Sequence, residues 1–365
     1  MMAQNTFLIG AYGYTAQLIA AQMAAAGLAF TAVGRDQTKL EQLQQEFVNC
    51  YGYIVADIQN EAMLDFLQKG AVVINCAGPF NLLAPTLLAK CIAVGAHYID
   101  ITGEQEIVRQ SYERYARTAR QNEICVLHSM AFESALTDIL LSYSLQKVAQ
   151  DEIEEVQSYY HIGSQQMSPG TKLTMKLANY HSNYIVENQR LLPFANQFAN
   201  VPKGLPFEAA RVVPYPEVIF AYERLQPKRA ASHFVVEQGS NLSFSGHFMR
   251  PAQTDEAQLH SIIERFKKVQ HVGPAATDRE KQHFELYLLL HTHNVTHVAS
   301  ISGYNMYEIT AALVVLTLQQ LQLRPTHFGV LSPGQFLDQA GLSWLLDNPY
   351  FTLNSPITLK NDAKI

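Results

Sequence analysis

The chain has 365 residues, a length that predicts two or three domains. Its 26 basic and 32 acidic residues give a net charge of −6 without long blocks of like charge, which argues against a nucleic-acid partner. Only 16% of residues are charged, against about 25% in typical soluble proteins, and we expect a doubly covered sheet and apolar contacts in a homodimer.

Residues 1–130 alternate short β-rich runs with helical patterns. The predicted strands span residues 6–9, 29–33, 51–55, 71–76, 97–101 and 124–127. The predicted helices between them span residues 15–26, 38–47, 61–68, 85–94 and 104–122. This alternation with short loops predicts an α/β fold, a doubly wound parallel Rossmann sheet.

After residue 130 the pattern changes to longer strands and fewer crossovers. The predicted strands span residues 154–162, 183–187, 231–236, 242–249, 284–291 and 296–303. The predicted helices span residues 134–148, 171–180, 255–269 and 307–321. Six prolines between Leu191 and Pro227 predict a long loop with little regular structure. We expect an α+β, mostly antiparallel second domain.

These patterns suggest three segments. Residues 1–130 form the nucleotide-binding domain, 131–320 the substrate and dimerisation domain, and 321–365 a segment that packs back on the core. Four cysteines without a C-x-x-C pair are typical of buried thiols in a reducing compartment. Without a signal peptide or an apolar run of ~18 residues, the chain is expected to be cytoplasmic, with no membrane span.

A glycine loop follows the first predicted strand and opens the first predicted helix, in the pattern Gly10-x-x-Gly13-x-x-Ala16. Such a turn lets backbone N–H groups and the positive end of the helix dipole approach a pyrophosphate. Thr15 either contacts a phosphate or simply caps the helix. The residues expected to hold the pyrophosphate are Gly10, Tyr12, Gly13, Tyr14, Thr15 and Ala16.

The end of the second predicted strand indicates which dinucleotide binds. Arg35 can meet a 2′-phosphate and favours NADP, whereas Asp36 keeps NAD possible or caps the next helix. Asp57, after the third strand, either meets the adenine amine or forms a turn. We therefore expect NADP, with NAD as the alternative.

The later strands end in residues that would line the same crevice, since ligands of such sheets bind at the carboxyl ends of the strands. Ala77, Gly78 and Pro79 would border the nicotinamide ribose. Asp100 and Glu104 follow the fifth strand and either act as acid/base groups or cap a helix. His128 ends the sixth strand and either contacts substrate or is a satisfied core histidine.

Five segments occur in order: GAYGYTA, VGRDQTKL, VVINCAGPF, HYIDITGE and AFESALTD. Together they resemble the saccharopine dehydrogenase-like NADP-binding family, including its trans-acting enoyl reductase branch, from the N-terminus as far as Asp138. The resemblance implies hydride transfer between the nicotinamide and a C=N, C=O or C=C group of a small molecule. Ala16, Ala131 and Glu133 depart from the family pattern, and the latter two put the substrate class in doubt.

A proton donor is expected among four candidate catalytic residues: Asp100, Glu104, His128 and Glu133. One alternative is a dinucleotide-binding sensor or scaffold without turnover. Another is an atypical short-chain dehydrogenase that uses Tyr143 and Lys147, spaced to share a helix face. His291, His293 and His297 look metal-like, but no cysteine or carboxylate lies beside them, and no metal is expected.

Overall fold

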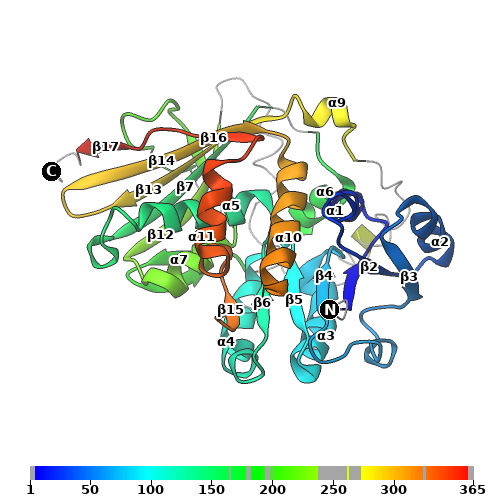
Figure 1. The fold of residues 1–365 in the computed structure, drawn as a ribbon. Coiled ribbons are helices and arrows are strands. Elements are labelled where there is room, and N and C mark those ends of the chain that lie inside the picture. The colour runs from blue at the N-terminus through cyan, green and yellow to red at the C-terminus, as the bar shows by residue number, and fades with distance from the viewer. Residues whose placement is uncertain are drawn as a thin grey trace. The chain divides into compact units, whose positions relative to one another are not determined.

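The computed structural model describes residues 5–163, 166–177, 182–193, 198–199, 201–236, 261–262, 273–323 and 326–360. The chain divides into two compact units (Figure 1). The first comprises Met1–Ala135, His271–Gly273 and Tyr307–Leu337, and the second comprises Leu136–Gln270, Pro274–Met306 and Asp338–Ile365. Each unit is built on its own sheet.

The first unit contains a seven-stranded sheet in which every described pairing is parallel. The strands, in chain order, are β1 (Thr6–Ile9), β2 (Phe30–Gly34), β3 (Cys50–Val55), β4 (Val72–Asn75), β5 (His97–Asp100), β6 (Cys125–Leu127) and β15 (Gly329–Leu331). Their spatial order is β15-β6-β5-β4-β1-β2-β3. The winding direction reverses between β1 and β4, which is where open α/β sheets bind ligands.

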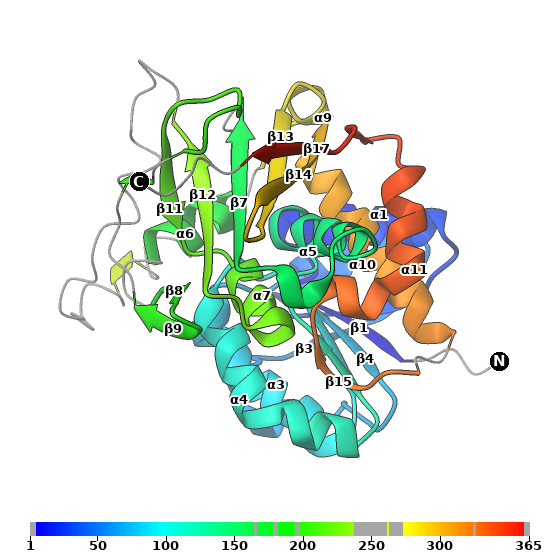
Figure 2. The same ribbon diagram turned by 90° about the vertical axis from the view of Figure 1, so that its left-hand side faces the viewer.

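Helices cover both faces of this sheet (Figures 1 and 2). They are α1 (Tyr14–Ala25), α2 (Gln37–Glu46), α3 (Phe80–Val94), α4 (Gln105–Gln121) and α10 (Met306–Gln322), with a 3₁₀ turn, η1 (Glu61–Met63). The pair α3 and α4 lies on one face, and α1 and α10 lie on the other. Apolar residues of α1, α2 and α10 join those of β1 and β4 in one core, which explains why these two central strands are mostly apolar.

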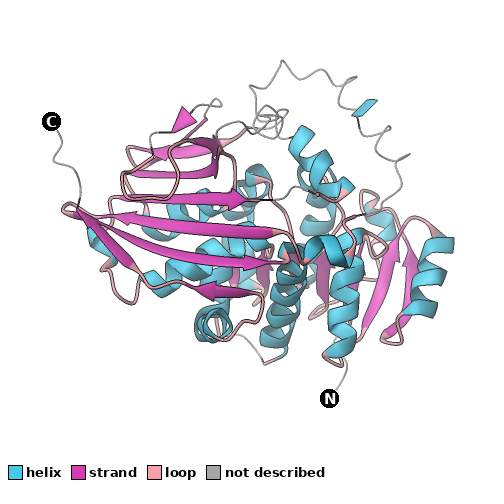
Figure 3. Cartoon of the chain, turned by 90° about the horizontal axis from the view of Figure 1, so that it is seen from above, coloured by secondary structure: helices cyan, strands magenta, loops and turns pink. Residues whose placement is uncertain are grey.

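The second unit contains a mixed, mostly antiparallel sheet (Figure 3). Its strands are β7 (Glu155–Ile162), β8 (Tyr184–Glu187), β9 (Arg190–Pro193), β10 (Phe198–Ala199), β11 (Ala210–Val213), β12 (Arg229–Val235), β13 (His283–His291), β14 (Val295–Tyr304), β16 (Phe351–Leu353) and β17 (Ile357–Lys360). The main order is β10-β11-β12-β7-β13-β14-β16, and β12 with β7 is the parallel pair among the described pairings.

Polar contacts attach α7 (Glu217–Leu225) to this sheet. The buried Glu217 Oε1 accepts from Tyr160 Oη and Ser232 Oγ, each at 2.6 Å. At the other end of the helix, the Arg224 guanidinium pairs with the buried carboxylate of Asp138. The remaining helices are α5 (Phe132–Ser144), which starts in the first unit, α6 (Pro169–Leu177), α9 (Ala276–Arg279), α11 (Pro333–Leu346) and the 3₁₀ turn η2 (Gln150–Glu152).

The expected fold class is confirmed, whereas several boundaries are wrong. The helix predicted at 61–68 is only the turn η1, and α3 begins at Phe80, well before the predicted start at Pro85. The predicted loop at 191–227 contains β11 and α7, among other elements, because its prolines flank them and Pro216 stands at the N-cap of α7. The predicted strand 242–249 lies outside the described residues, as does nearly all of the predicted helix 255–269.

Within the described ranges, no helix is both long and apolar enough to cross a bilayer. The four cysteines are free thiols; Cys50, Cys91 and Cys125 are buried and Cys76 is partly buried. Burial raises the pKa of the Cys125 thiol to about 12, so this group stays protonated and inert at neutral pH.

Candidate functional site

The glycine loop joins the carboxyl end of β1 to the start of α1. Gly10 has a φ of +68°, and its N–H donates to the Val33 carbonyl oxygen at 2.9 Å. The N-cap of α1 is Gly13, which offers no side-chain cap, so Thr15 is not the cap and lies in the first turn. The start of α1 is therefore not capped by a side chain of its own helix, which suits a phosphate ligand.

Two glycines allow close backbone approach at this corner. A Cβ on Gly10 would lie 3.2 Å from the backbone of Ala77, so the β1–α1 turn and the β4–α3 turn touch here. A Cβ on Gly13 would lie 3.0 Å from the Gly10 carbonyl oxygen. The ring of Tyr14 makes an edge contact with Tyr307 of α10, with centroids 5.0 Å apart. Because these neighbours hold it, the loop has a fixed shape.

The end of β2 is followed by three charged side chains. Arg35 is exposed, and its backbone N–H donates to Tyr12 Oη at 3.2 Å. Asp36 caps α2, since its Oδ1 accepts from Lys39 N at 3.2 Å. Lys39 Nζ lies 3.7 Å from Asp36 Oδ2 and 5.4 Å from the centroid of the Tyr12 ring. Asp57, after β3, accepts from Gln59 N at 3.0 Å and so makes a turn contact.

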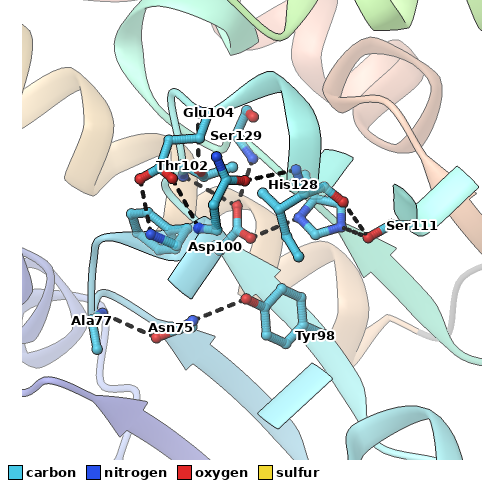
Figure 4. Close-up of polar contacts among 12 residues, drawn as sticks. Asn75, Ala77, Tyr98, Asp100, Thr102, Glu104, Ser111, His128 and Ser129 are labelled. Carbon is cyan, nitrogen blue, oxygen red and sulfur yellow. Dashed lines mark hydrogen bonds and ion pairs between the residues drawn. The ribbon is translucent and has the colours of Figure 1, made fainter. Parts of the chain in front are cut away.

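The end of β4 is braced by a buried hydrogen-bond chain (Figure 4). Asn75 Oδ1 accepts from Ala77 N at 3.0 Å, and Asn75 Nδ2 donates to Tyr98 Oη at 2.9 Å. Burial raises the pKa of the Tyr98 hydroxyl well above its ordinary value, and the nearby Asp100 raises it further. The turn that carries Gly78 and Pro79 is thus held by a neutral tyrosine on the neighbouring strand.

Glu104 caps the N-terminus of α3. Its Oε1 accepts from Phe80 N and its Oε2 from Asn81 N, both at 2.8 Å. Asn81 returns the contact, because its Oδ1 accepts from Ile107 N in the first turn of α4 at 2.8 Å. Each helix is therefore capped by a side chain from the start of the other. A carboxylate at a helix N-terminus also stabilises the helix dipole, so Glu104 has a structural role in this geometry.

Asp100 and His128 form a fully buried pair. Asp100 Oδ2 lies 2.6 Å from His128 Nδ1, while Asp100 Oδ1 accepts from Thr102 N and Ser129 N at 3.1 and 2.9 Å. His128 Nε2 lies 2.8 Å from Ser111 Oγ. The His128 and Asp100 side chains are 1% and 0% exposed, so no solvent screens the pair.

The positions of the protons in the hydrogen-bond chain Asp100–His128–Ser111 follow from the contacts of Ser111. The Ser111 hydroxyl donates to the Ile107 carbonyl oxygen at 2.7 Å, so its oxygen accepts the proton of His128 Nε2. A second proton must then lie between His128 Nδ1 and Asp100 Oδ2, because two bare acceptors would repel at 2.6 Å. The pair is therefore neutral as a whole, as deep burial requires.

Ser129 lies at the same edge and is not among the expected catalytic or cofactor-binding residues. It has a φ of +59°, which is uncommon for serine, and its backbone N–H is held by Asp100. Its hydroxyl is buried and has no hydrogen-bond partner in the described part of the chain. Figure 4 shows it beside Asp100 and Thr102. Its position directly after β6 is the sequence feature that could have identified it as a residue of this edge.

The remaining candidates differ in exposure. Glu133 is half-buried in the first turn of α5. Helix α5 stops at Ser144 rather than at 148, so Tyr143 lies in its last turn and Lys147 lies beyond it; Lys147 Nζ donates to Tyr143 Oη at 2.9 Å on the exposed surface. His291 Nδ1 contacts Thr296 Oγ1 at 2.7 Å. Among described residues, no group of three metal-ligating side chains gathers.

Comparisons with known proteins give a family match for part of the first unit. A family model described as the saccharopine dehydrogenase NADP binding domain matches residues 6–127. The bovine saccharopine dehydrogenase-like oxidoreductase is 27% identical over 175 residues, which are 43% of this chain and 41% of the bovine protein. A Mycobacterium tuberculosis protein named as a trans-acting enoyl reductase is 27% identical over 151 residues, 40% of this chain and 36% of that protein.

The chain thus spans about two fifths of the length of the relatives it matches. A solved structure, the apo histidine-tagged saccharopine dehydrogenase (L-Glu forming) from Saccharomyces cerevisiae, has a TM-score of 0.62 at 12% identity, covering 98% of this chain and 100% of the yeast chain. That likeness concerns the fold. With the glycine loop, the exposed Arg35 and the family match taken together, residues 6–127 belong to the saccharopine dehydrogenase NADP-binding domain family.

Proposed function

We propose that the protein is an NADP-dependent oxidoreductase that transfers hydride to or from a C=N, C=O or C=C group of a small molecule. The observation that carries this is the start of α1, where Gly13 provides no side-chain cap, beside the exposed Arg35. Backbone donors would hold the pyrophosphate and Arg35 the 2′-phosphate. When bound, the nicotinamide ring supplies the hydride or accepts it.

The chain itself would orient the ring and exclude water. The turn at Ala77, Gly78 and Pro79 would border the nicotinamide ribose, braced from below by Asn75 and Tyr98. Asp100, Glu104 and His128 would act as positioning residues, because their hydrogen-bonding atoms are already used inside the fold. The Ser129 hydroxyl, which has no partner among the described residues, is a further candidate for contact with a ligand.

Glu133 differs from the other three candidate proton donors in its exposure. It is half-buried, while Asp100, Glu104 and His128 are buried. We propose that it donates or accepts the substrate proton, since a general acid must reach the reacting group. A Glu133→Gln variant should keep NADPH affinity and lose at least about 100-fold in turnover, the range of acid–base catalysis.

Fluorescence titration with NADPH and NADH tests cofactor binding. The wild type should bind NADPH more tightly, and Arg35→Ala should lose much of that preference while it keeps its affinity for NADH. Arg117→Ala is a matched control, because Arg117 is also exposed but lies on α4. Failure of the wild type to bind either cofactor would overturn the proposal.

A substrate screen separates an enzyme from a sensor. NADPH oxidation would be followed against imines, ketones and enoyl thioesters. Tight NADPH binding without turnover of any class would favour a non-catalytic sensor.

We also propose a cytoplasmic homodimer, supported by the low charge and the free thiols. Sedimentation equilibrium tests the dimer.

A further inference from the structure

Lys39 lies beside the predicted 2′-phosphate site and holds only a loose ion pair within the described part of the chain. Its ammonium is 3.7 Å from Asp36, and its side chain is 50% exposed, so the ion pair is screened by solvent. It lies within cation–π range of the Tyr12 ring, at 5.4 Å. Arg35, which precedes it by about one helical turn, is exposed as well. Two cations therefore reach the corner where β2 ends.

Tyr12 fixes the geometry of this corner. Its hydroxyl accepts from Arg35 N at 3.2 Å, and its ring lies so close to Gly34 that a Cβ there would be 2.6 Å from the ring. The tyrosine is thus clamped between the glycine loop and the end of β2. It offers one fixed aromatic surface to Lys39 and one fixed contact to the backbone of Arg35.

Asp36 is already occupied in this arrangement. Its Oδ1 caps α2 through Lys39 N, and its Oδ2 faces Lys39 Nζ. To accept a ribose 2′-hydroxyl, it would have to share or release the cap. A phosphate, by contrast, would meet Lys39 and Arg35 and add to the favourable charge at the start of α2.

We propose that Lys39 is a second determinant of specificity for the 2′-phosphate and that Tyr12 is the residue that positions it. This inference rests on the proposed function. The preference for NADPH over NADH would then come from two cations, with Asp36 acting as a cap and not as a ribose ligand.

The first test replaces the lysine. Lys39→Met should weaken NADPH binding about ten-fold, the effect of one charge-assisted hydrogen bond. NADH binding should change less than about two-fold, because NADH lacks the phosphate. Lys69→Met is the control, since Lys69 is exposed in the same unit but precedes β4, at the opposite edge of the sheet.

The second test replaces the cap. Asp36→Asn keeps a good N-cap and removes a negative charge, so NADPH should bind several-fold more tightly while NADH is unchanged. Loss of NADH affinity in this variant would show that Asp36 binds the ribose, and it would overturn the inference. The variant separates the two roles because the helix cap survives.

The third test separates positioning from general support. Tyr12→Leu should weaken NADPH binding and reduce the further effect of Lys39→Met, whereas Tyr12→Phe should keep most of both. Equal losses for NADPH and NADH in Tyr12→Leu would mean a purely structural role. If the wild type binds neither cofactor, both the proposed function and the proposed role of Lys39 are wrong. If it prefers NADPH and Lys39→Met keeps the full preference, only this inference falls.

Discussion

Two corners of the same sheet edge use charge in opposite ways. At the end of β2, Arg35 and Lys39 are exposed and only loosely engaged. At the ends of β5 and β6, Asp100 and His128 are buried and every polar atom of their side chains is paired. The first corner leaves two cationic side chains exposed, and the second uses its polar groups to hold the backbone.

The contrast shows that residues at one edge of a sheet can differ widely in burial and in hydrogen-bond partners. Asp100, Glu104 and His128 all stand at the carboxyl edge, where such residues are expected. Asp100 and His128 nevertheless pair with each other, and the other partners of the three residues are backbone N–H groups and one serine of the same unit. A change at the buried corner should therefore act first on stability, and a change at the exposed corner on affinity.

The largest expected effect is at the buried pair. His128→Leu would leave Asp100 without its proton-bearing partner, and we expect a loss of about 3–5 kcal/mol in the free energy of unfolding. Urea denaturation at pH 7 measures it. A loss below about 1 kcal/mol, combined with lost turnover, would break the contrast, because His128 would then serve chemistry rather than structure.

The second prediction extends the contrast to pH. Burial lowers the pKa of His233 on β12 to about 4, below its ordinary value of about 6.5. The unfolded chain takes up this proton as pH falls through 6.5, whereas the folded chain does so only near 4. His233 therefore stabilises the fold above pH 6.5, and this contribution is lost on acidification.

Urea denaturation at pH 7 and pH 4.5 tests this. The wild type should lose about 2–3 kcal/mol more than His233→Gln between the two values, as follows from two pKa units at about 1.4 kcal/mol each. Identical pH slopes for the two proteins would contradict the neutral state of buried His233.

The third effect is smaller. Glu104→Gln removes the charge at the start of α3 and one of the two hydrogen-bond acceptors, which should lower the free energy of unfolding by about 1 kcal/mol. Asp65→Asn is the control, because Asp65 forms an exposed ion pair with Lys90 and should contribute less than about 0.5 kcal/mol. Unchanged stability together with abolished turnover would instead indicate that Glu104 acts on the reacting group.

The smallest effect is expected at Tyr143. Its contact with Lys147 is exposed, so Tyr143→Phe should change the free energy of unfolding by less than about 0.5 kcal/mol. NADPH affinity and any turnover should match the wild type. Loss of turnover with unchanged NADPH affinity would instead support the short-chain dehydrogenase alternative.

The sequence predicts the nucleotide-binding sheet well because its strands are short, apolar and separated by helical patterns. It fails where a distant residue decides. Pro85 suggests a helix start, yet α3 begins at Phe80, since Glu104 supplies the cap from a later turn of the chain. The helix predicted at 61–68 reduces to a 3₁₀ turn capped by Asn60. No local pattern around Phe80 predicts a cap from Glu104.

The site shows the same division. The glycine loop and Arg35 could be found from motif and position. The braces Asn75, Tyr98 and Ser111 could not, because the partner of each lies on another strand or helix. Lys39 lies in the segment VGRDQTKL, but its role at this corner is indicated by its distance from Tyr12.

The seventh strand, β15, bears on how the chain is made. It pairs in parallel with β6, although the whole second sheet except β16 and β17 lies between them in the sequence, and α10 supplies part of the core beside α1. A ribosome that has released the chain only as far as Ala135 would expose the β6 edge and an apolar patch over α1. The nucleotide-binding fold is thus completed late in synthesis, and a fragment that ends at Ala135 should need help to stay unaggregated.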